Sequence, residues 1–180
     1  MNMRQLGILC VTAALACAPA ASARAEVIES TPNGFIVRHV AALNASPAKV
    51  YDAIVDVAKW WDPAHSYSGK AANMSIDARA GGCFCERLDK EGSGGSVQHL
   101  TVVFAAPGEM LRMRGGLGPL QDSGASGALT FALAEKDGKT ELTMTYVVGG
   151  YFKGGLQGVA APVDAVLGGQ LERLKKSVGQ

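Results

Sequence analysis

The chain lacks most of the patterns that would identify a chemical activity. Its 17 Lys and Arg nearly balance its 16 Asp and Glu, and it has no basic run of the kind that binds nucleic acid. It contains no GxSxG elbow, P-loop, GxGxxG fingerprint or HExxH helix. Its three histidines, His39, His65 and His99, have no metal-ligand spacing. We therefore expect no cofactor, no bound metal and no nucleic-acid partner.

Only one segment is apolar enough to suggest a membrane-directed role, and it lies at the N-terminus. Residues 6–18 form an apolar run of roughly 13 residues, too short for the ~20 that span a bilayer. Residues 23–25 then fit a small-x-small cleavage pattern. We expect residues 1–25 to be a signal peptide, giving a periplasmic or secreted protein with no stable membrane insertion. A lipoprotein anchored at Cys17 is less favoured, because Ala14 stands where a large apolar residue is usual.

Cysteine is scarce in the expected mature chain, where Cys83 and Cys85 alone remain after Cys10 and Cys17 leave with the signal peptide. In an extended strand, residues two apart point to the same face with Cα atoms roughly 6.5–7 Å apart. That spacing is at or beyond the usual disulfide limit, so a bridge would require a bend in the strand. Three interpretations stay open: reduced thiols buried as small core residues, which we favour, a redox-active bridge, or a soft-metal site for an ion such as Cu(I).

The remaining sequence alternates short strands with two helical zones. A strand is predicted at 35–43, and Ser46 followed by Pro47 predicts a helix start, with the helix running to about Val57. Trp60-Trp61-Asp62-Pro63 predicts a turn. Further strands are predicted at 72–77, 83–89, 96–105, 109–114, 127–134 and 141–148. Because their connections are short and rich in turn residues, these strands predict an antiparallel sheet.

The C-terminal zone predicts a long helix with one continuous apolar stripe. The stripe consists of Leu156, Val159, Ala160, Val163, Val166, Leu167, Leu171, Leu174 and Val178. Pro162 is expected to kink or restart this helix, because it lacks an N–H and crowds the preceding turn. Gly168 and Gly169 would allow a close approach to the sheet. A long striped helix after a meander of strands indicates an α+β domain in which the helix packs on the sheet.

Several short motifs, taken in order, carry a family resemblance. They are Ser46-Pro47-Ala48-Lys49-Val50-Tyr51, Trp60-Trp61-Asp62-Pro63, Ser68-Gly69, residues 80–86, residues 115–120 and residues 170–174. Their order and spacing resemble the SRPBCC superfamily, with its START-like, polyketide cyclase/dehydrase and Hsp90-ATPase-activator-like domains. The resemblance implies a helix-grip fold at 34–180, preceded by an N-terminal extension at 26–33. In that fold a curved antiparallel sheet wraps a long C-terminal helix, with two short helices after the first strand.

The resemblance implies a hydrophobic cavity between sheet and helix, but it does not decide activity, since members bind lipids and hormones, cyclise polyketides, oxygenate rings or assist chaperones. The chain lacks the cysteine, histidine and carboxylate sets that hold iron in the oxygenases. Hsp90 activation needs a cytosolic partner, and the predicted export signal speaks against it. We therefore expect an exported, non-enzymatic protein that binds a small hydrophobic ligand of lipid, polyketide or aromatic type, with its oligomeric state undetermined.

Candidate ligand-binding residues come from the predicted helix stripe and from the segments that the resemblance places at the cavity. They are Trp60, Trp61, Tyr67, Cys83, Cys85, His99, Arg112, Leu117, Leu156, Val159, Val163 and Leu167, with Val166 beside them on the helix. Of the two tryptophans, one is expected in the core and the other at the rim. Residues 115–120 are interpreted as a mobile gate loop, or alternatively as a Gly-rich hairpin without function.

Two alternatives to simple binding remain. A cyclase- or hydrolase-type enzyme could use Cys83 or Cys85 with His99 or Glu86, because hairpin pairing could turn His99 toward the cysteines. Glu86 could also pair across the sheet with Arg112, or the two could hold a polar head group. The second alternative is a thiol redox or soft-metal module at the Cys-x-Cys sequence.

Overall fold

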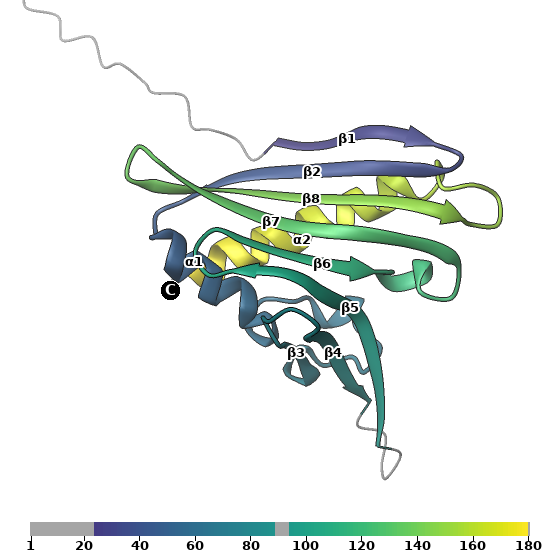
Figure 1. Cartoon of the computed structure of the whole chain (residues 1–180), viewed down its shortest axis with the longest axis horizontal. Coiled ribbons are helices and arrows are strands. Elements are labelled where there is room, and N and C mark those ends of the chain that lie inside the picture. Colours follow the sequence, from purple (N-terminus) through teal and green to yellow (C-terminus); the bar gives the residue numbers. More distant parts are fainter. Residues whose placement is uncertain (1–23, 89–93, 180) are drawn as a thin grey trace, which may run out of the picture.

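The structure is a computed structural model that describes residues 24–88 and 94–179. Its eight strands form one sheet in the order β1-β2-β8-β7-β6-β5-β4-β3, and every neighbouring pair is antiparallel. The strands are β1 (Arg24–Thr31), β2 (Gly34–Leu43), β3 (Met74–Ile76), β4 (Cys83–Leu88), β5 (Gly95–Ala106), β6 (Met110–Gly115), β7 (Gly124–Lys136) and β8 (Lys139–Tyr151). The α-helices are α1 (Pro47–Val55) and α2 (Ala160–Val178). The long helix α2 crosses one face of the curved sheet (Figure 1), so the predicted α+β helix-grip fold is confirmed.

Two predicted elements differ in kind from what forms. The second short helix is a series of 3₁₀ turns, Val57–Lys59, Pro63–His65 and Ala71–Asn73, and not an α-helix. The last of these takes up the start of the strand predicted at 72–77, leaving only Met74–Ile76 extended. The predicted extension 26–33 supplies most of β1, an edge strand that pairs with β2. Of the predicted signal peptide, residues 1–23 lie outside the described residues.

The start of α1 follows directly from its sequence. Ser46 is the N-cap, its hydroxyl oxygen accepting a hydrogen bond from Lys49 N at 3.4 Å, and Pro47 fills the first helical position, where no N–H is needed. Val50, Tyr51 and Ile54 recur at helical spacing and are buried. The helix ends at Val55, two residues earlier than predicted, because the chain tightens into the first 3₁₀ turn.

The helix α2 begins later than the apolar stripe suggested. It starts at Ala160, so Pro162 lies in the first turn, where a missing N–H costs little, and produces no kink inside the helix. Leu156 is buried ahead of the helix, with its N–H bonded to the carbonyl of Pro32. The expected close approach holds at Gly168, where a Cβ would lie 3.1 Å from His39 Cε1. Gly169 is exposed and approaches nothing within 4 Å.

Three polar contacts connect α2 to the rest of the fold. On β2, His39 Nε2 lies 3.0 Å from Asp164 Oδ1 of the helix. One turn and a half later, the Gln170 amide oxygen accepts a hydrogen bond from Asp62 N at 2.9 Å. Arg173 Nε donates to the carbonyl of Trp60 at 3.1 Å. The helix is therefore fixed both to the sheet and to the segment that carries the two tryptophans.

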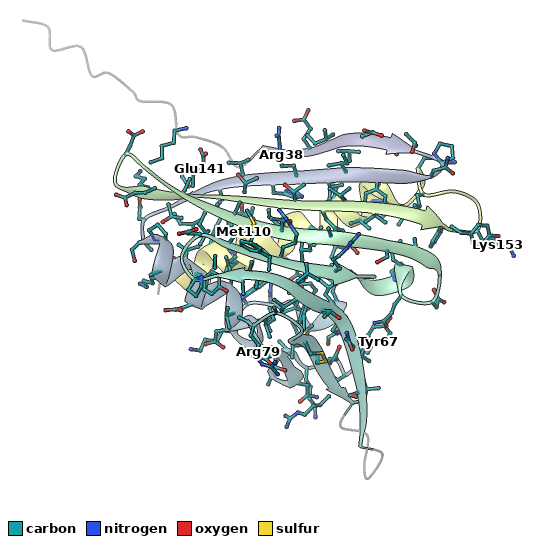
Figure 2. All side chains as sticks on the ribbon, in the orientation of Figure 1. Arg38, Tyr67, Arg79, Met110, Glu141 and Lys153 are labelled. Atoms are coloured by element: carbon teal, nitrogen blue, oxygen red, sulfur yellow. A yellow bond between two sulfur atoms is a disulfide. The ribbon has the colours of Figure 1, made fainter. Side chains whose placement is uncertain are left out.

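The two faces of the sheet differ sharply. Along β2 and β8 every second residue is buried under α2, as in Val37, Leu142 and Tyr146. The opposite face is open, and Figure 2 shows Arg38 and Met110 projecting from it, away from α2. This alternation is the period-two pattern of a sheet with one solvated face. Any ligand site between sheet and helix must therefore be built from inward-pointing residues.

Candidate functional site

A cavity of about 400 Å³ lies between the first half of α2 and the β5 end of the sheet. This volume falls within the few hundred to about 1,000 Å³ typical of small-molecule sites. Three segments enclose it besides β5: residues 61–67, the loop at 117–119 and residues 159–167. Its walls are formed by Trp61, Ala64, His65, Ser66, Tyr67, His99, Leu117, Gly118, Pro119, Val159, Pro162, Val163, Val166 and Leu167.

Two aromatic side chains form one wall of the cavity. Trp61 is 6% exposed, and its ring meets Phe84 edge-on with centroids 5.4 Å apart. The indole N–H of Trp61 donates to the carbonyl of His65 at 2.9 Å, which fixes the ring. Tyr67 is 51% exposed, and its hydroxyl donates to the carbonyl of Gly118 at 3.3 Å. Tyr67 thus ties the segment 61–67 to the loop that closes the cavity from the other side.

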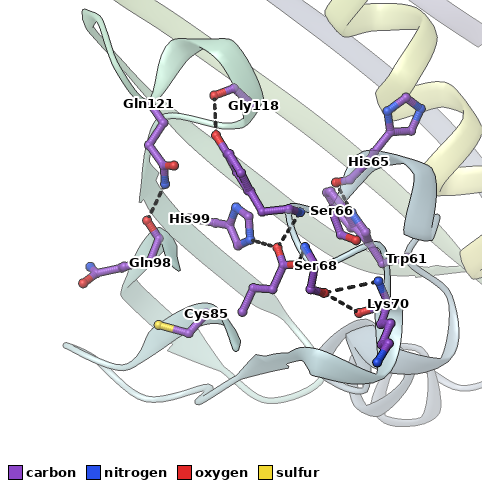
Figure 3. A network of polar contacts seen from close by, with 12 residues as sticks. Trp61, His65, Ser66, Ser68, Lys70, Cys85, Gln98, His99, Gly118 and Gln121 are labelled. Atoms are coloured by element: carbon purple, nitrogen blue, oxygen red, sulfur yellow. Dashed lines mark hydrogen bonds and ion pairs between the residues drawn. The ribbon is translucent and has the colours of Figure 1, made fainter. Parts of the chain in front are cut away.

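The polar centre of the site is a buried Glu86–His99 pair. Glu86, with no exposed surface, accepts hydrogen bonds from Tyr67 N at 3.1 Å and Ser68 N at 2.5 Å. Its carboxylate also lies 3.0 Å from Nε2 of His99. The imidazole is 4% exposed and lies against the ring of Tyr67, with centroids 5.8 Å apart. Figure 3 shows the hydrogen bonds of this network, with His99 and Ser68 labelled.

An irregularity in strand pairing turns His99 toward the cavity. Phe84 pairs with Leu100 and Cys85 with Gln98, so His99 is an extra residue on β5. His99 and Leu100 are consecutive and both buried, which a regular strand with alternating faces does not allow. A β-bulge of this kind re-aims a side chain. The bulge therefore brings His99 to the inner face beside Glu86.

The environment sets the protonation state of the pair. Burial alone would raise the pKa of Glu86, but hydrogen bonds from Ser68, Tyr67 and His99 outweigh it and lower that pKa below 4.5. Burial lowers the pKa of His99 below 6.5, and the neighbouring carboxylate only partly opposes this. At neutral pH, Glu86 is ionised and His99 is neutral. The Nε2 proton of His99 points at the carboxylate, and Nδ1 carries the lone pair.

The chain that forms this cavity matches one protein family over most of its length. A model for the family described as "Activator of Hsp90 ATPase homolog 1-like protein" matches residues 44–179. The chain belongs to this family. No curated protein matches it.

Solved structures of similar shape show how widely this fold is used. A protein from Chromobacterium violaceum is 21% identical, with a TM-score of 0.56, and the match covers 83% of this chain and 99% of that one. The Aha1 dimer from Colwellia psychrerythraea is 17% identical, with a TM-score of 0.53 and coverage of 79% and 95%. Ara h 8.0201 is 14% identical, with a TM-score of 0.56 and coverage of 81% and 97%. At such identities the likeness shows the fold alone.

In this member of the family, seven of the twelve candidate ligand-binding residues line the cavity, and Val166 does so too. The seven are Trp61, Tyr67, His99, Leu117, Val159, Val163 and Leu167. Ala64, His65, Ser66 and Pro162 also line the cavity and were not among the candidates, while Gly118 and Pro119 belong to the loop 115–120 that was interpreted as a gate. Only the closeness of these residues in sequence to Trp61, Leu117 and Val163 could have indicated them.

Five candidates lie elsewhere. Trp60 is 3% exposed, so both tryptophans are buried, and its indole N–H donates to the carbonyl of Ala53 at 2.9 Å. Leu156 packs in the core ahead of α2. Arg112 is on the outer face of β6, where Nε donates to the Thr130 hydroxyl at 2.9 Å. The expected pairing of Arg112 with Glu86 is therefore wrong, because the two residues point to opposite faces of the sheet.

The remaining two, Cys83 and Cys85, also face away from the cavity. They alternate with the buried Phe84 and Glu86 along β4, and they are joined by a disulfide (Figure 2). Their Cα atoms are 5.3 Å apart, because β4 bends where it pairs with the bulge. The favoured interpretation as reduced core thiols is wrong, and so is the alternative in which His99 could face one of the cysteines. Within residues 24–88 and 94–179, no three His, Cys, Asp or Glu side chains are grouped to hold a metal ion.

The disulfide should matter little for stability or for the cavity. The ring that it closes is very short, so replacing both cysteines with serine is expected to lower the free energy of unfolding by less than about 2 kcal/mol. Ligand uptake should persist, because neither sulfur reaches the cavity. Urea unfolding and probe titration of the Cys83→Ser/Cys85→Ser variant check both expectations. Loss of uptake in a folded variant would show that the disulfide on the outer face of β4 is needed to shape the cavity on the inner face.

The loop at 115–120 is attached to the sheet at its start. Tyr146, buried on β8, donates its hydroxyl hydrogen to the carbonyl of Gly115 at 3.1 Å and accepts from Leu117 N at 3.2 Å. Burial raises the pKa of Tyr146 to about 12, so the phenol stays protonated and able to donate. Leu120 closes the loop as a buried residue. The predicted gating movement stays a prediction, with Gly118 and Pro119 as the part of the loop that lines the cavity.

Acidification below pH 6.5 is expected to destabilise the fold. Burial holds the pKa values of His39 and His99 below 6.5, so the unfolded chain binds more protons than the folded chain just below that pH. Each unit of pKa difference lowers the free energy of unfolding by about 1.4 kcal/mol. Glu86 adds a second loss below pH 4.5. Urea midpoints at about pH 8, 6 and 4 should fall in that order; a midpoint that is constant or rises would contradict these protonation states.

Proposed function

We propose that the chain is a non-enzymatic binding protein that holds a small hydrophobic ligand between the sheet and α2. The cavity of about 400 Å³, walled by Trp61 and by the apolar side of α2, is the observation that supports this proposal. An apolar ligand buried there would gain roughly 25 cal/mol for each Å² of surface removed from water. The resemblance to ligand-binding helix-grip proteins points in the same direction.

The shape of the site suits capture and retention more than passage. Val159 at the N-cap of α2 and Val163 and Leu167 on the helix form an apolar strip with one residue per turn, and Trp61 lines the same cavity. The helix is fixed by Asp164 and Gln170 to the sheet and to the tryptophan segment. The hydrogen bond between the exposed Tyr67 and Gly118 joins two of the segments that enclose the cavity, and we propose that a ligand opens this bond on entry.

The test is recovery of the natural ligand. The full chain would be expressed with its own N-terminus, isolated under gentle conditions, and examined by native mass spectrometry, followed by extraction and analysis of small molecules. We expect one apolar molecule for each chain. A protein that arrives empty and also takes up neither fluorescent lipid nor polyphenol probes would overturn the proposal.

We further propose that the protein works outside the cytosol, in the periplasm or as a secreted protein. The apolar N-terminal run and the cleavage pattern at residues 23–25 support this. Among the described residues, no helix is long and apolar enough to cross a membrane. Mass measurement of the exported chain should show that it begins at Glu26. Retention of the intact chain in the cytosol would contradict export and would restore Hsp90 activation as a candidate role.

One observation favours the enzymatic alternative, namely the Glu86–His99 pair at the cavity wall. A histidine oriented by a buried carboxylate is the arrangement of a general base. The cysteines cannot serve as the nucleophile, because they are bonded to each other on the outer face. If the recovered ligand is chemically changed on incubation with the protein, but not with a His99→Gln variant, the cyclase- or hydrolase-type function gains the support that it lacks.

A further inference from the structure

The polar groups that line the cavity are nearly all occupied within the protein. The indole N–H of Trp61 donates to the carbonyl of His65, and the Tyr67 hydroxyl donates to the carbonyl of Gly118. The Ser66 hydroxyl donates to the carbonyl of Pro63 at 2.8 Å. These three side chains therefore have no hydrogen left for a ligand. Apart from the solvent-exposed His65, the side chains of the lining have no free hydrogen for the acceptor oxygen of a ligand.

Two histidines also line the cavity: His65 is exposed to solvent, whereas His99 is buried and offers an acceptor to a ligand. Its Nε2 is covered by Glu86, and no residue within 24–88 and 94–179 bonds to its other ring nitrogen, Nδ1. Figure 3 shows the imidazole held at one nitrogen and without a contact at the other. Because His99 lines the cavity, Nδ1 is the polar atom that this side chain presents there. An imidazole that donates at Nε2 accepts at Nδ1.

The charges near the cavity also favour a neutral ligand over an anionic one. No Lys, Arg, Asp or Glu is among the residues that line the cavity. The nearest formal charge in the network is the buried Glu86 carboxylate, directly behind His99. An anionic ligand would lose its hydration without gaining a cation, and it would face a carboxylate of the same sign. A fatty acid or another carboxylate is therefore poorly matched.

We propose that the ligand is a neutral, largely aromatic or polycyclic molecule with a single hydroxyl group, which donates a hydrogen bond to Nδ1 of His99. This inference rests on the proposed binding function and narrows it from any apolar ligand to a phenol or alcohol. The flat faces of Trp61 and Tyr67 match the ring system, and the strip on α2 packs against its apolar part. The Glu86 carboxylate holds the imidazole in the accepting tautomer.

Four size-matched probes test the proposal by calorimetric titration: 1-naphthol, 1-methoxynaphthalene, naphthalene and 1-naphthoate. We expect 1-naphthol to bind about tenfold or more tightly than the methyl ether or the hydrocarbon, because those two leave a buried acceptor unpaired. Naphthoate should bind most weakly. Equal binding of the first three would overturn the hydroxyl preference and leave the binding function standing. Tightest binding of naphthoate would also overturn the proposal. Failure of all four would count against the binding function itself.

Variants and one spectroscopic measurement identify His99 as the source of the preference. In a Glu86→Gln/His99→Phe variant, which removes the acceptor without stranding a charge, the ratio of naphthol to ether affinity should fall to about one. The control is Gln98→Phe, on the same strand but with an exposed side chain, where the ratio should persist. If the double variant does not fold, ¹⁵N NMR of the wild-type imidazole decides. Naphthol, but not its ether, should move the Nδ1 resonance toward that of a hydrogen-bonded nitrogen, and an unmoved resonance would overturn the proposal.

Discussion

Replacing Val163 with tryptophan is expected to abolish uptake of hydrophobic ligands while the chain still folds. Val163 lines the cavity from the second turn of α2, between Val159 and Leu167, and its side chain is only half-buried. A tryptophan there can enter the empty volume without displacing packed core atoms, so its main effect is to fill the space that a ligand needs. Probe affinity should fall by more than about a hundredfold, the equivalent of roughly 2.7 kcal/mol or more.

The matched control for this change is Ala165→Trp. Ala165 is on the same helix but is exposed to solvent, so the same side chain is added without entering the cavity. Its probe affinity should remain within about twofold of the unmodified protein, and circular dichroism should show both variants folded. Unchanged uptake by a folded Val163→Trp protein would show that the ligand binds elsewhere.

Removing the buried carboxylate at Glu86 is expected to cause the largest loss of stability. In Glu86→Ala, the N–H groups of Tyr67 and Ser68 and the Nε2 of His99 all lose their acceptor in a site closed to water. Leaving buried hydrogen-bond donors without an acceptor costs about 1–3 kcal/mol for each group. Urea unfolding at neutral pH measures it, and the segment that carries Tyr67 should become the part most open to proteolysis.

Two companion variants separate burial from charge in this prediction. Glu172 pairs with Lys175 at 2.8 Å on the exposed side of α2, so Glu172→Ala should change the free energy of unfolding by less than about 1 kcal/mol. Glu86→Gln keeps one acceptor oxygen and should fall between the two. A Glu86→Ala variant no less stable than Glu172→Ala would mean that water reaches this network and satisfies the freed donors.

Strong local patterns in the sequence were sufficient to predict the architecture. Ser46 and Pro47 define a helix start through local hydrogen bonding, and turn residues such as Asp137 and Gly138 connect β7 to β8, so these features need little tertiary information. The apolar stripe of α2 predicted which side faces the sheet. The stripe placed Leu156 on the helix, although the helix begins only at Ala160. A buried residue of an irregular segment cannot be distinguished in sequence from one on a helix face.

The polar part of the site could not be predicted, because it depends on strand register. In a regular ladder His99 would share the outer face of β5 with Thr101, and one extra residue in β5 turns it to the inner face. The same irregularity bends β4 and brings Cys83 and Cys85 within bonding distance. No pattern in the sequence predicted the bulge. The interpretation of the thiols and the expected partners of His99 and Glu86 therefore failed together.

The positions of Trp60 and Trp61 were also only partly predictable from the sequence. Adjacent tryptophans were expected to divide between core and rim, which holds for residues in one regular element. Trp60 and Trp61 lie in a tightening turn after a 3₁₀ segment, where both indoles can fold inward, with ring centroids 5.5 Å apart. One of them supports α1 and the other lines the cavity. Their burial follows from loop geometry that propensity alone does not predict.

The most direct test of ligand binding between sheet and helix is an NMR measurement on methyl-labelled protein with bound 1-naphthol. Intermolecular nuclear Overhauser effects should connect the probe to the methyl groups of Leu117 in the loop and of Val163 and Leu167 on α2, two segments that both line the cavity. The methyl groups of Val103, exposed on β5, should show none. Contacts confined to Val103 and the exposed residues around it, with Val163 and Leu167 silent, would contradict the account.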